Sequence, residues 1–202
     1  MMWFQIDKSR TAQPAKGTYK DWKDILRVEG RYQCVYCTIS EGRFGGLRNF
    51  HVEHYRPKSK YAAHENSIAN LFYACAICNS FKGSDWPGDP AKDFSNAAYP
   101  DPSACCYSEF LSVDGHGLVG SSVVAGKFIV ERLYLNRPQL VNARGLSRTI
   151  GAIIKLSEEM NGLIERAPDG LRTQLIDALL ATIKLLGKLK DVRPYEPADV
   201  QR

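Results

Sequence analysis

Four cysteines stand in two pairs with the spacing of metal ligands. The segments "CVYC" and "CAIC" each place two thiols three positions apart, a knuckle that directs both sulfurs at one tetrahedral ion. Two knuckles complete a four-thiolate site, and the metal would close the 37-residue loop between them. The sequence therefore predicts a structural zinc ion, Zn²⁺, bound by Cys34, Cys37, Cys75 and Cys78.

The presence of two knuckles rather than one favours a zinc site over a redox pair or buried free thiols. A single C-x-x-C would fit a redox pair or two buried thiols about as well, whereas two copies favour a metal. The adjacent Cys105 and Cys106 have no partner knuckle. We interpret these two as small core residues.

The loop between the knuckles, with the residues just after it, carries groups suited to phosphodiester hydrolysis. Zinc bound by four thiolates has no open position, so chemistry requires other residues. Glu53 and Asn79 can offer oxygen ligands to a hard divalent cation, Mg²⁺ or Mn²⁺. A neighbouring imidazole titrates near neutral pH and can take a proton from water. Positive side chains would bind the phosphate, and the candidates are Arg56, Lys58 and Lys82.

Together these residues resemble the HNH endonucleases, the ββα-metal class. The resemblance covers about residues 31–86: a C-x-x-C, then "EH" with a proline three residues later, then "NLFYACAICNSFKG". It implies that His54 is the general base, that Asn70 orients the loop and the His54 imidazole, and that Glu53 and Asn79 bind the catalytic divalent ion. Glu53 stands where aspartate is commoner, and Asn79 stands at the last position of the family's name.

The alternation of side chains along a strand decides whether Glu53 and His54 can point to the same side. His51 lies two residues before Glu53 and would share its face on a regular strand, so we consider His51 as a further metal ligand. His54 would then face the opposite way. We therefore expect a bend or turn at residues 53–55 that directs both Glu53 and His54 inward.

A longer pattern of segments extends the resemblance and points to one subgroup of HNH proteins. The segments "HVEHYRPKS", "NLFYACAICNSFKGSDWP", "YPDP" and "LYLNRPQLVNAR" extend it to about residue 144. They are similar to the HNH proteins of bacterial antiphage systems of the Septu and retron type. This resemblance implies an ATPase partner beside the nuclease.

The rest of the chain must position this centre, and its patterns predict an α+β fold. Residues 1–30 read as an N-terminal arm and helix, and residues 31–90 as the HNH nuclease module with its four-cysteine zinc site. Residues 91–135 form a connection rich in Pro, Gly, Asp and Ser, in which "GKFIVERLYL" fits a strand or a helix. Residues 136–202 carry apolar stripes at helical spacing, and we expect a helical hairpin that docks on the module.

Bulk composition is that of an ordinary globular protein. The chain has 202 residues, 44% hydrophobic and 24% charged, with a net charge of +5 that suits a polyanion such as DNA. The first residues lack the apolar region of a signal peptide, and no apolar run approaches the roughly 18 residues of a membrane span. We expect a cytoplasmic protein with reduced cysteines and no membrane partner.

Two other functions stay open. The chain would fit a non-catalytic, zinc-bound nucleic-acid-binding protein, or a partner-docking protein that presents its helical hairpin. A reader of nucleic acid would not need Glu53, His54 and Asn79 together. Further arginines are considered as an extension of a backbone-binding surface, namely Arg132, Arg137 and Arg144.

Overall fold

The structure is a computed structural model, which describes residues 3–190. These residues form two compact units, the first ending at Val141 and the second beginning at Asn142. Helices and small antiparallel sheets make up the described chain, so the predicted α+β class is confirmed. The end of the predicted C-terminal region, residues 191–202, lies outside the described residues.

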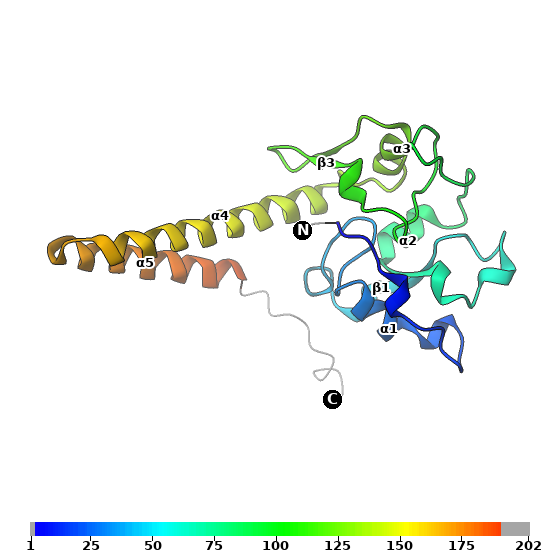
Figure 1. Cartoon of the computed structure of the whole chain (residues 1–202), viewed down its shortest axis with the longest axis horizontal. Coiled ribbons are helices and arrows are strands. Elements are labelled where there is room, and N and C mark those ends of the chain that lie inside the picture. Colours follow the sequence, from blue (N-terminus) through cyan, green and yellow to red (C-terminus); the bar gives the residue numbers. More distant parts are fainter. Residues whose placement is uncertain (1–2, 191–202) are drawn as a thin grey trace. The chain divides into compact units, whose positions relative to one another are not determined.

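The N-terminal arm leads into a short helix, α1 (Lys23–Glu29) (Figure 1). Leu26 on this helix is fully buried. Arg27 forms an ion pair with Glu41, with Nε 2.6 Å from Oε2, and the Tyr73 hydroxyl donates to the same carboxylate at 2.8 Å. Because these polar groups are paired with one another, the helix can pack closely on the first knuckle and on the sheet.

The central sheet has two antiparallel strands, β1 (Phe50–His54) and β2 (Leu71–Cys75). All five residues of β2 are buried because α1 and α2 (Ala76–Lys82) both pack against it. The register is unbroken through His54, and the Tyr55 amide still donates to the Asn70 carbonyl at 2.9 Å. The chain bends from Tyr55 onward, so the bend expected at residues 53–55 lies at the last of these residues, while Glu53 and His54 belong to the regular strand.

The predicted loop-rich connection contains regular elements of its own. A small hairpin, β3 (Ser112–Val113) with β4 (Val119–Gly120), is followed by α3 (Val124–Arg132). The segment "GKFIVERLYL", which fitted either a strand or a helix, starts within α3 and runs on beyond its end. Ala125, Ile129 and Leu133 recur every four residues and are fully buried, which is one face of a helix.

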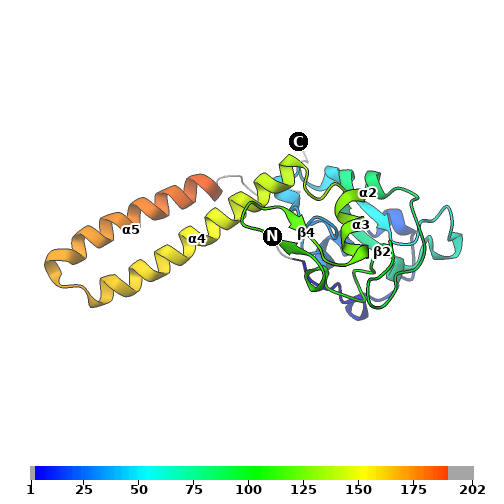
Figure 2. The same ribbon diagram turned by 90° about the horizontal axis from the view of Figure 1, so that it is seen from above.

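The C-terminal helices are α4 (Pro138–Arg166) and α5 (Asp169–Lys190), which lie side by side in both views (Figures 1 and 2). Pro138 opens α4, where a missing amide hydrogen costs nothing. The predicted helical hairpin is confirmed, while its docking on the module stays a prediction. None of the described helices combines the length and the apolar character needed to cross a bilayer.

Candidate metal centre and active site

The four predicted ligands of zinc converge on one point. The sulfurs of the cluster lie within 4.8 Å of one another, and all four residues are buried. A tetrahedral ion with metal–sulfur bonds of about 2.3 Å needs sulfurs about 3.8 Å apart. The Sγ atoms of Cys37 and Cys75 are 3.8 Å apart. The donor set and its spacing therefore fit zinc, and the cluster comprises Cys34, Cys37, Cys75 and Cys78.

Local backbone geometry builds each knuckle. In the first, the Cys34 amide donates to the Ile39 carbonyl at 3.0 Å, and the Thr38 amide donates back to the Cys34 carbonyl at 2.9 Å. In the second, Cys75 caps α2, and its sulfur accepts from the Cys78 amide at 3.5 Å. Backbone hydrogen bonds within each knuckle thus hold both pairs of cysteines in position.

The predicted general base, His54, is the last residue of β1. Its Nε2 lies 3.0 Å from the Glu65 carbonyl oxygen. A carbonyl can only accept, so Nε2 carries the hydrogen and Nδ1 is left as the acceptor nitrogen. Burial lowers the pKa of His54 below its ordinary value of 6.5. The imidazole is therefore neutral at pH 7, and the Tyr19 ring packs on it with centroids 4.7 Å apart.

Glu53, the predicted ligand of the catalytic ion, lies in a buried polar cluster. Its Oε1 is 2.7 Å from the Lys82 ammonium and accepts from the Tyr36 hydroxyl at 3.2 Å. Lys82 also donates to the His54 carbonyl at 2.9 Å. Burial raises the pKa of the Glu53 carboxyl, and the hydrogen bonds from Lys82 and Tyr36 act in the opposite direction.

A pocket of about 340 Å³ brings the predicted catalytic groups together. Glu53, His54 and Asn79 all line it, with Tyr19 and Lys58 among the other lining residues. Three consecutive residues of β1, from Val52 to His54, line this pocket, and among the described residues the strand pairs only with β2.

His51 lies beside this group rather than within the pocket lining. It is exposed, and its Nδ1 is 3.4 Å from the Asn79 amide nitrogen. The histidine and the carboxamide therefore meet, but a role for His51 as a metal ligand stays a prediction.

Asn70 clamps the loop that follows β1. Its Oδ1 accepts from the Arg56 amide at 2.8 Å, and its Nδ2 donates to the carbonyls of Arg56 and His64 at 3.0 and 3.2 Å. The imidazole of His54 is held by the Glu65 carbonyl, so Asn70 acts on it only through the loop.

The three predicted phosphate-binding residues differ in their exposure. Lys82 is buried, with its ammonium bonded to Glu53 and to the His54 carbonyl, so the predicted phosphate contact does not fit its position. Lys58 is exposed at the pocket and donates to the Tyr19 hydroxyl at 2.7 Å. Arg56 is partly exposed and pairs with Asp89 at 2.9 Å.

Sequence reasoning missed several residues of the site. Tyr36 lies inside the first knuckle, so its position in "CVYC" was a usable signal. Tyr19 comes from the N-terminal arm, and Glu65 acts through its backbone carbonyl. Nothing in the sequence marked these last two residues.

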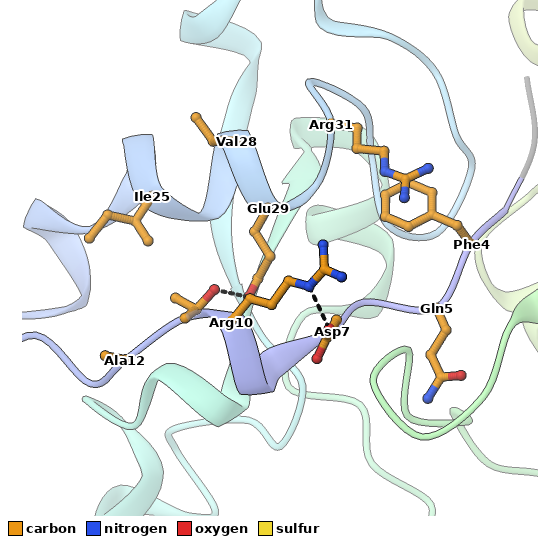
Figure 3. A pocket seen from close by; sticks show the side chains of 10 residues that line it. Phe4, Gln5, Asp7, Arg10, Ala12, Ile25, Val28, Glu29 and Arg31 are labelled. Carbon is orange, nitrogen blue, oxygen red and sulfur yellow. Dashed lines mark hydrogen bonds and ion pairs between the residues drawn. The ribbon is translucent and has the colours of Figure 1, made fainter.

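A second pocket, of about 600 Å³, lies between the N-terminal arm and α1 (Figure 3). Its polar groups are paired within the pocket: Arg10 with Asp7 at 2.9 Å, and Thr11 with Glu29 at 2.7 Å. None of the sequence-predicted site residues lines it. The groups suited to hydrolysis are therefore those of the smaller pocket.

The comparison with protein families agrees with this geometry. The family described as HNH endonuclease matches residues 34–85, which run from the first cysteine of the first knuckle to just beyond α2. Residues 34–85 fit a zinc-bound HNH module. This match supports a nuclease. The searches of curated proteins and of solved structures returned no match.

HNH nucleases use a divalent metal, and the pocket of this module fits such an ion in part. Glu53 and Asn79 bring a carboxylate and a carboxamide oxygen to one space, the ligand types that Mg²⁺ and Mn²⁺ prefer. The Glu53 carboxylate is, however, already paired with Lys82. An incoming cation would share that carboxylate with the lysine.

Proposed function

We propose that this protein is a metal-dependent endonuclease that hydrolyses DNA phosphodiester bonds. The observation that carries the proposal is the state of His54. Its Nε2–H is directed to the Glu65 carbonyl, which leaves Nδ1 of the neutral ring as the acceptor nitrogen, and His54 lines the same pocket as Glu53 and Asn79. A fixed, neutral imidazole beside oxygen ligands is what general-base hydrolysis requires.

The residues act in a simple order. A water molecule next to Nδ1 of His54 gives up its proton to that nitrogen as it attacks phosphorus in line with the departing 3′ oxygen. The Glu65 carbonyl, on the loop that Asn70 clamps, holds the ring and its tautomer. Glu53 and Asn79 would hold a divalent ion, which when bound stabilises the developing negative charge. Lys58, exposed at the pocket, would bind the phosphate backbone.

We also propose the biological setting that the sequence resemblance implies. The longer pattern, from "HVEHYRPKS" to "LYLNRPQLVNAR", supports a role as the effector nuclease of a bacterial antiphage system. In that setting the nuclease works in the cytoplasm with an ATPase partner. Co-purification from a host that expresses both proteins tests the partner.

A plasmid-nicking assay tests the catalytic proposal. Supercoiled DNA is incubated with wild type or with His54→Ala, in Mg²⁺ or Mn²⁺, and conversion to nicked and linear forms is followed. Wild type should cut and His54→Ala should lose at least about a hundredfold in rate, the usual contribution of a general base. His116→Ala, which changes an exposed histidine in the β3–β4 turn, is the matched control and should cut like wild type.

The same assay distinguishes the alternative function. If neither wild type nor His54→Ala cuts while both bind DNA with equal affinity, the protein is a nucleic-acid reader and the nuclease proposal is overturned.

A further inference from the structure

Arg137 lies against the four-cysteine cluster, although it comes 59 residues after Cys78, the last cysteine of that cluster. Its Nη2 is 3.4 Å from the sulfur of Cys78, 3.6 Å from that of Cys37 and 3.7 Å from that of Cys75. The residue lies outside the family match and had been considered only as part of a DNA-backbone surface. One guanidinium nitrogen thus faces three of the four predicted metal ligands.

The other end of the guanidinium is fixed by the chain that follows α3. Nη1 donates to the Leu133 carbonyl at 3.0 Å and to the Tyr134 carbonyl at 3.3 Å. The neighbouring Leu133, Leu135 and Leu140 of the same segment are fully buried. Because the guanidinium is planar and rigid, anchoring one nitrogen sets the direction of the other.

The contact between Arg137 and the cysteine sulfurs is electrostatically favourable when zinc is bound. Four thiolates around a divalent zinc ion leave two net negative charges, and this cluster is buried. Buried charge is costly unless it is paired or hydrogen-bonded. Arg137 supplies a permanent positive charge and N–H donors directed at the sulfurs. The Nε of Arg137 is buried without a hydrogen-bond partner among the described residues. The guanidinium is therefore oriented so that its Nη1 and Nη2 groups, rather than Nε, make the hydrogen bonds.

We propose that Arg137 is a positioning residue of the zinc centre. It balances the charge of the thiolates and ties residues 133–141, where α4 begins, to the HNH module. Loading of the metal and seating of this segment are therefore one coupled event. The proposal rests on zinc binding by the cysteines and is independent of the nuclease activity.

The first measurement is the rate at which full-length, zinc-loaded protein releases zinc to a colorimetric chelator. Partners of metal ligands typically contribute 10–100-fold to metal affinity. We expect Arg137→Gln to release zinc about 10–100-fold faster than wild type. Arg137→Lys should lie in between, because lysine keeps the positive charge but lacks the planar set of N–H donors of the guanidinium. Arg132→Gln is the control, since that arginine pairs with Asp85 and should leave the rate unchanged.

A second measurement separates charge balance from a merely structural role. In protein loaded with Co²⁺ instead of zinc, removal of the positive guanidinium beside the sulfurs makes the thiolates better electron donors. The sulfur-to-cobalt charge-transfer band should therefore move to lower energy in Arg137→Gln and partly return in Arg137→Lys. Hydrogen exchange should rise across residues 133–141 in zinc-loaded Arg137→Gln while β1 and β2 stay protected.

Three results would overturn the proposal. The first is a zinc-release rate and a charge-transfer band in Arg137→Gln equal to those of wild type. The second is a wild-type protein that binds no zinc by metal analysis. If Arg137→Gln does not fold, Arg137→Lys carries the test, and a wild-type rate and band in that variant count against the proposal. Loss of DNA cleavage with normal zinc release bears only on the nuclease.

Discussion

At the scale of single residues, the most informative group is the buried set around Glu53. A lysine, a tyrosine and a glutamate share hydrogen bonds beneath the pocket, and the lysine also bonds the backbone of the proposed base. Lys82 therefore fixes Glu53 and His54 relative to each other. Lys82, which was expected to bind phosphate, is instead buried and bonded to Glu53 and to the backbone of His54.

Removal of the Lys82 ammonium should destabilise the protein strongly. Lys82→Met leaves the Glu53 carboxylate buried without its cation, which typically costs about 3–5 kcal/mol of unfolding free energy. Urea unfolding of the zinc-loaded protein measures this change. Lys58→Met is the control, because the ion pair of Lys58 is exposed and contributes little.

A double variant makes the reason for that loss testable. Adding Glu53→Gln to Lys82→Met removes the unpaired charge, so part of the lost stability should return. Equal stability of the single and double variants would contradict this account.

The state of His54 predicts a pH dependence of cleavage. A general base acts when neutral, and burial lowers the pKa of His54 below 6.5. Activity should therefore persist through pH 6.5 and fall only as the pH drops through the lowered pKa. The acid limb of kcat/KM against pH measures this, and a midpoint above pH 7 would argue against His54 as the base.

Residue types and spacing were enough to predict which of the proposed catalytic groups meet, but not how each one is paired. The order of Glu53, His54 and Asn79 in the motif predicted a shared space, and all three line one pocket. The burial of Lys82 could not be predicted, because a lysine after C-x-x-C reads the same whether its ammonium reaches solvent or a carboxylate. That choice depends on how α2 packs against β1.

At the scale of elements, the zinc knuckles hold the small sheet and α2 together. Two five-residue strands and a seven-residue helix are too short to be stable alone. Structural zinc sites contribute about 10–16 kcal/mol in small domains, which matches the whole stability of a typical domain, about 5–15 kcal/mol. The metal should therefore be required for this part of the fold.

Zinc removal should unfold the HNH module. We expect a strong chelator, or Cys78→Ser, to abolish the protection of β1 and β2 amides against hydrogen exchange and to lower the thermal midpoint. Cys106→Ser is the control, since its thiol lies outside the cluster and should leave zinc content unchanged. An unchanged melting curve after full zinc removal would exclude a structural role for the metal.

Element boundaries were predictable where periodicity was clear. The apolar stripes of α4 and α5 predicted the hairpin, whereas the run "GKFIVERLYL" fits a strand as well as a helix. The helical face shows in the burial of Ala125, Ile129 and Leu133 within the first unit, and that packing is a tertiary effect.

At the scale of the whole molecule, the net charge of +5 is the property that bears on DNA. Positive side chains that neutralise phosphates release counterions, so affinity falls as salt rises. The chain has no basic tail, and the charge is spread over the described units. Binding should therefore be moderate and mainly electrostatic.

Salt titration tests this property without cleavage. Using His54→Ala, we expect affinity for a duplex to fall at least about tenfold between roughly 50 and 200 mM salt, the direction expected of phosphate contacts. Fluorescence anisotropy measures the binding. Affinity that does not change with salt would point to a partner other than DNA.

The adjacency of Cys78 and Asn79 on α2 has a practical consequence for protein engineering. The metal clamp and the proposed cutting centre share one short helix, so neither can be transplanted to another scaffold without the other. A designer who weakened the affinity for zinc would thereby obtain a nuclease whose working state is set by the supply of free zinc.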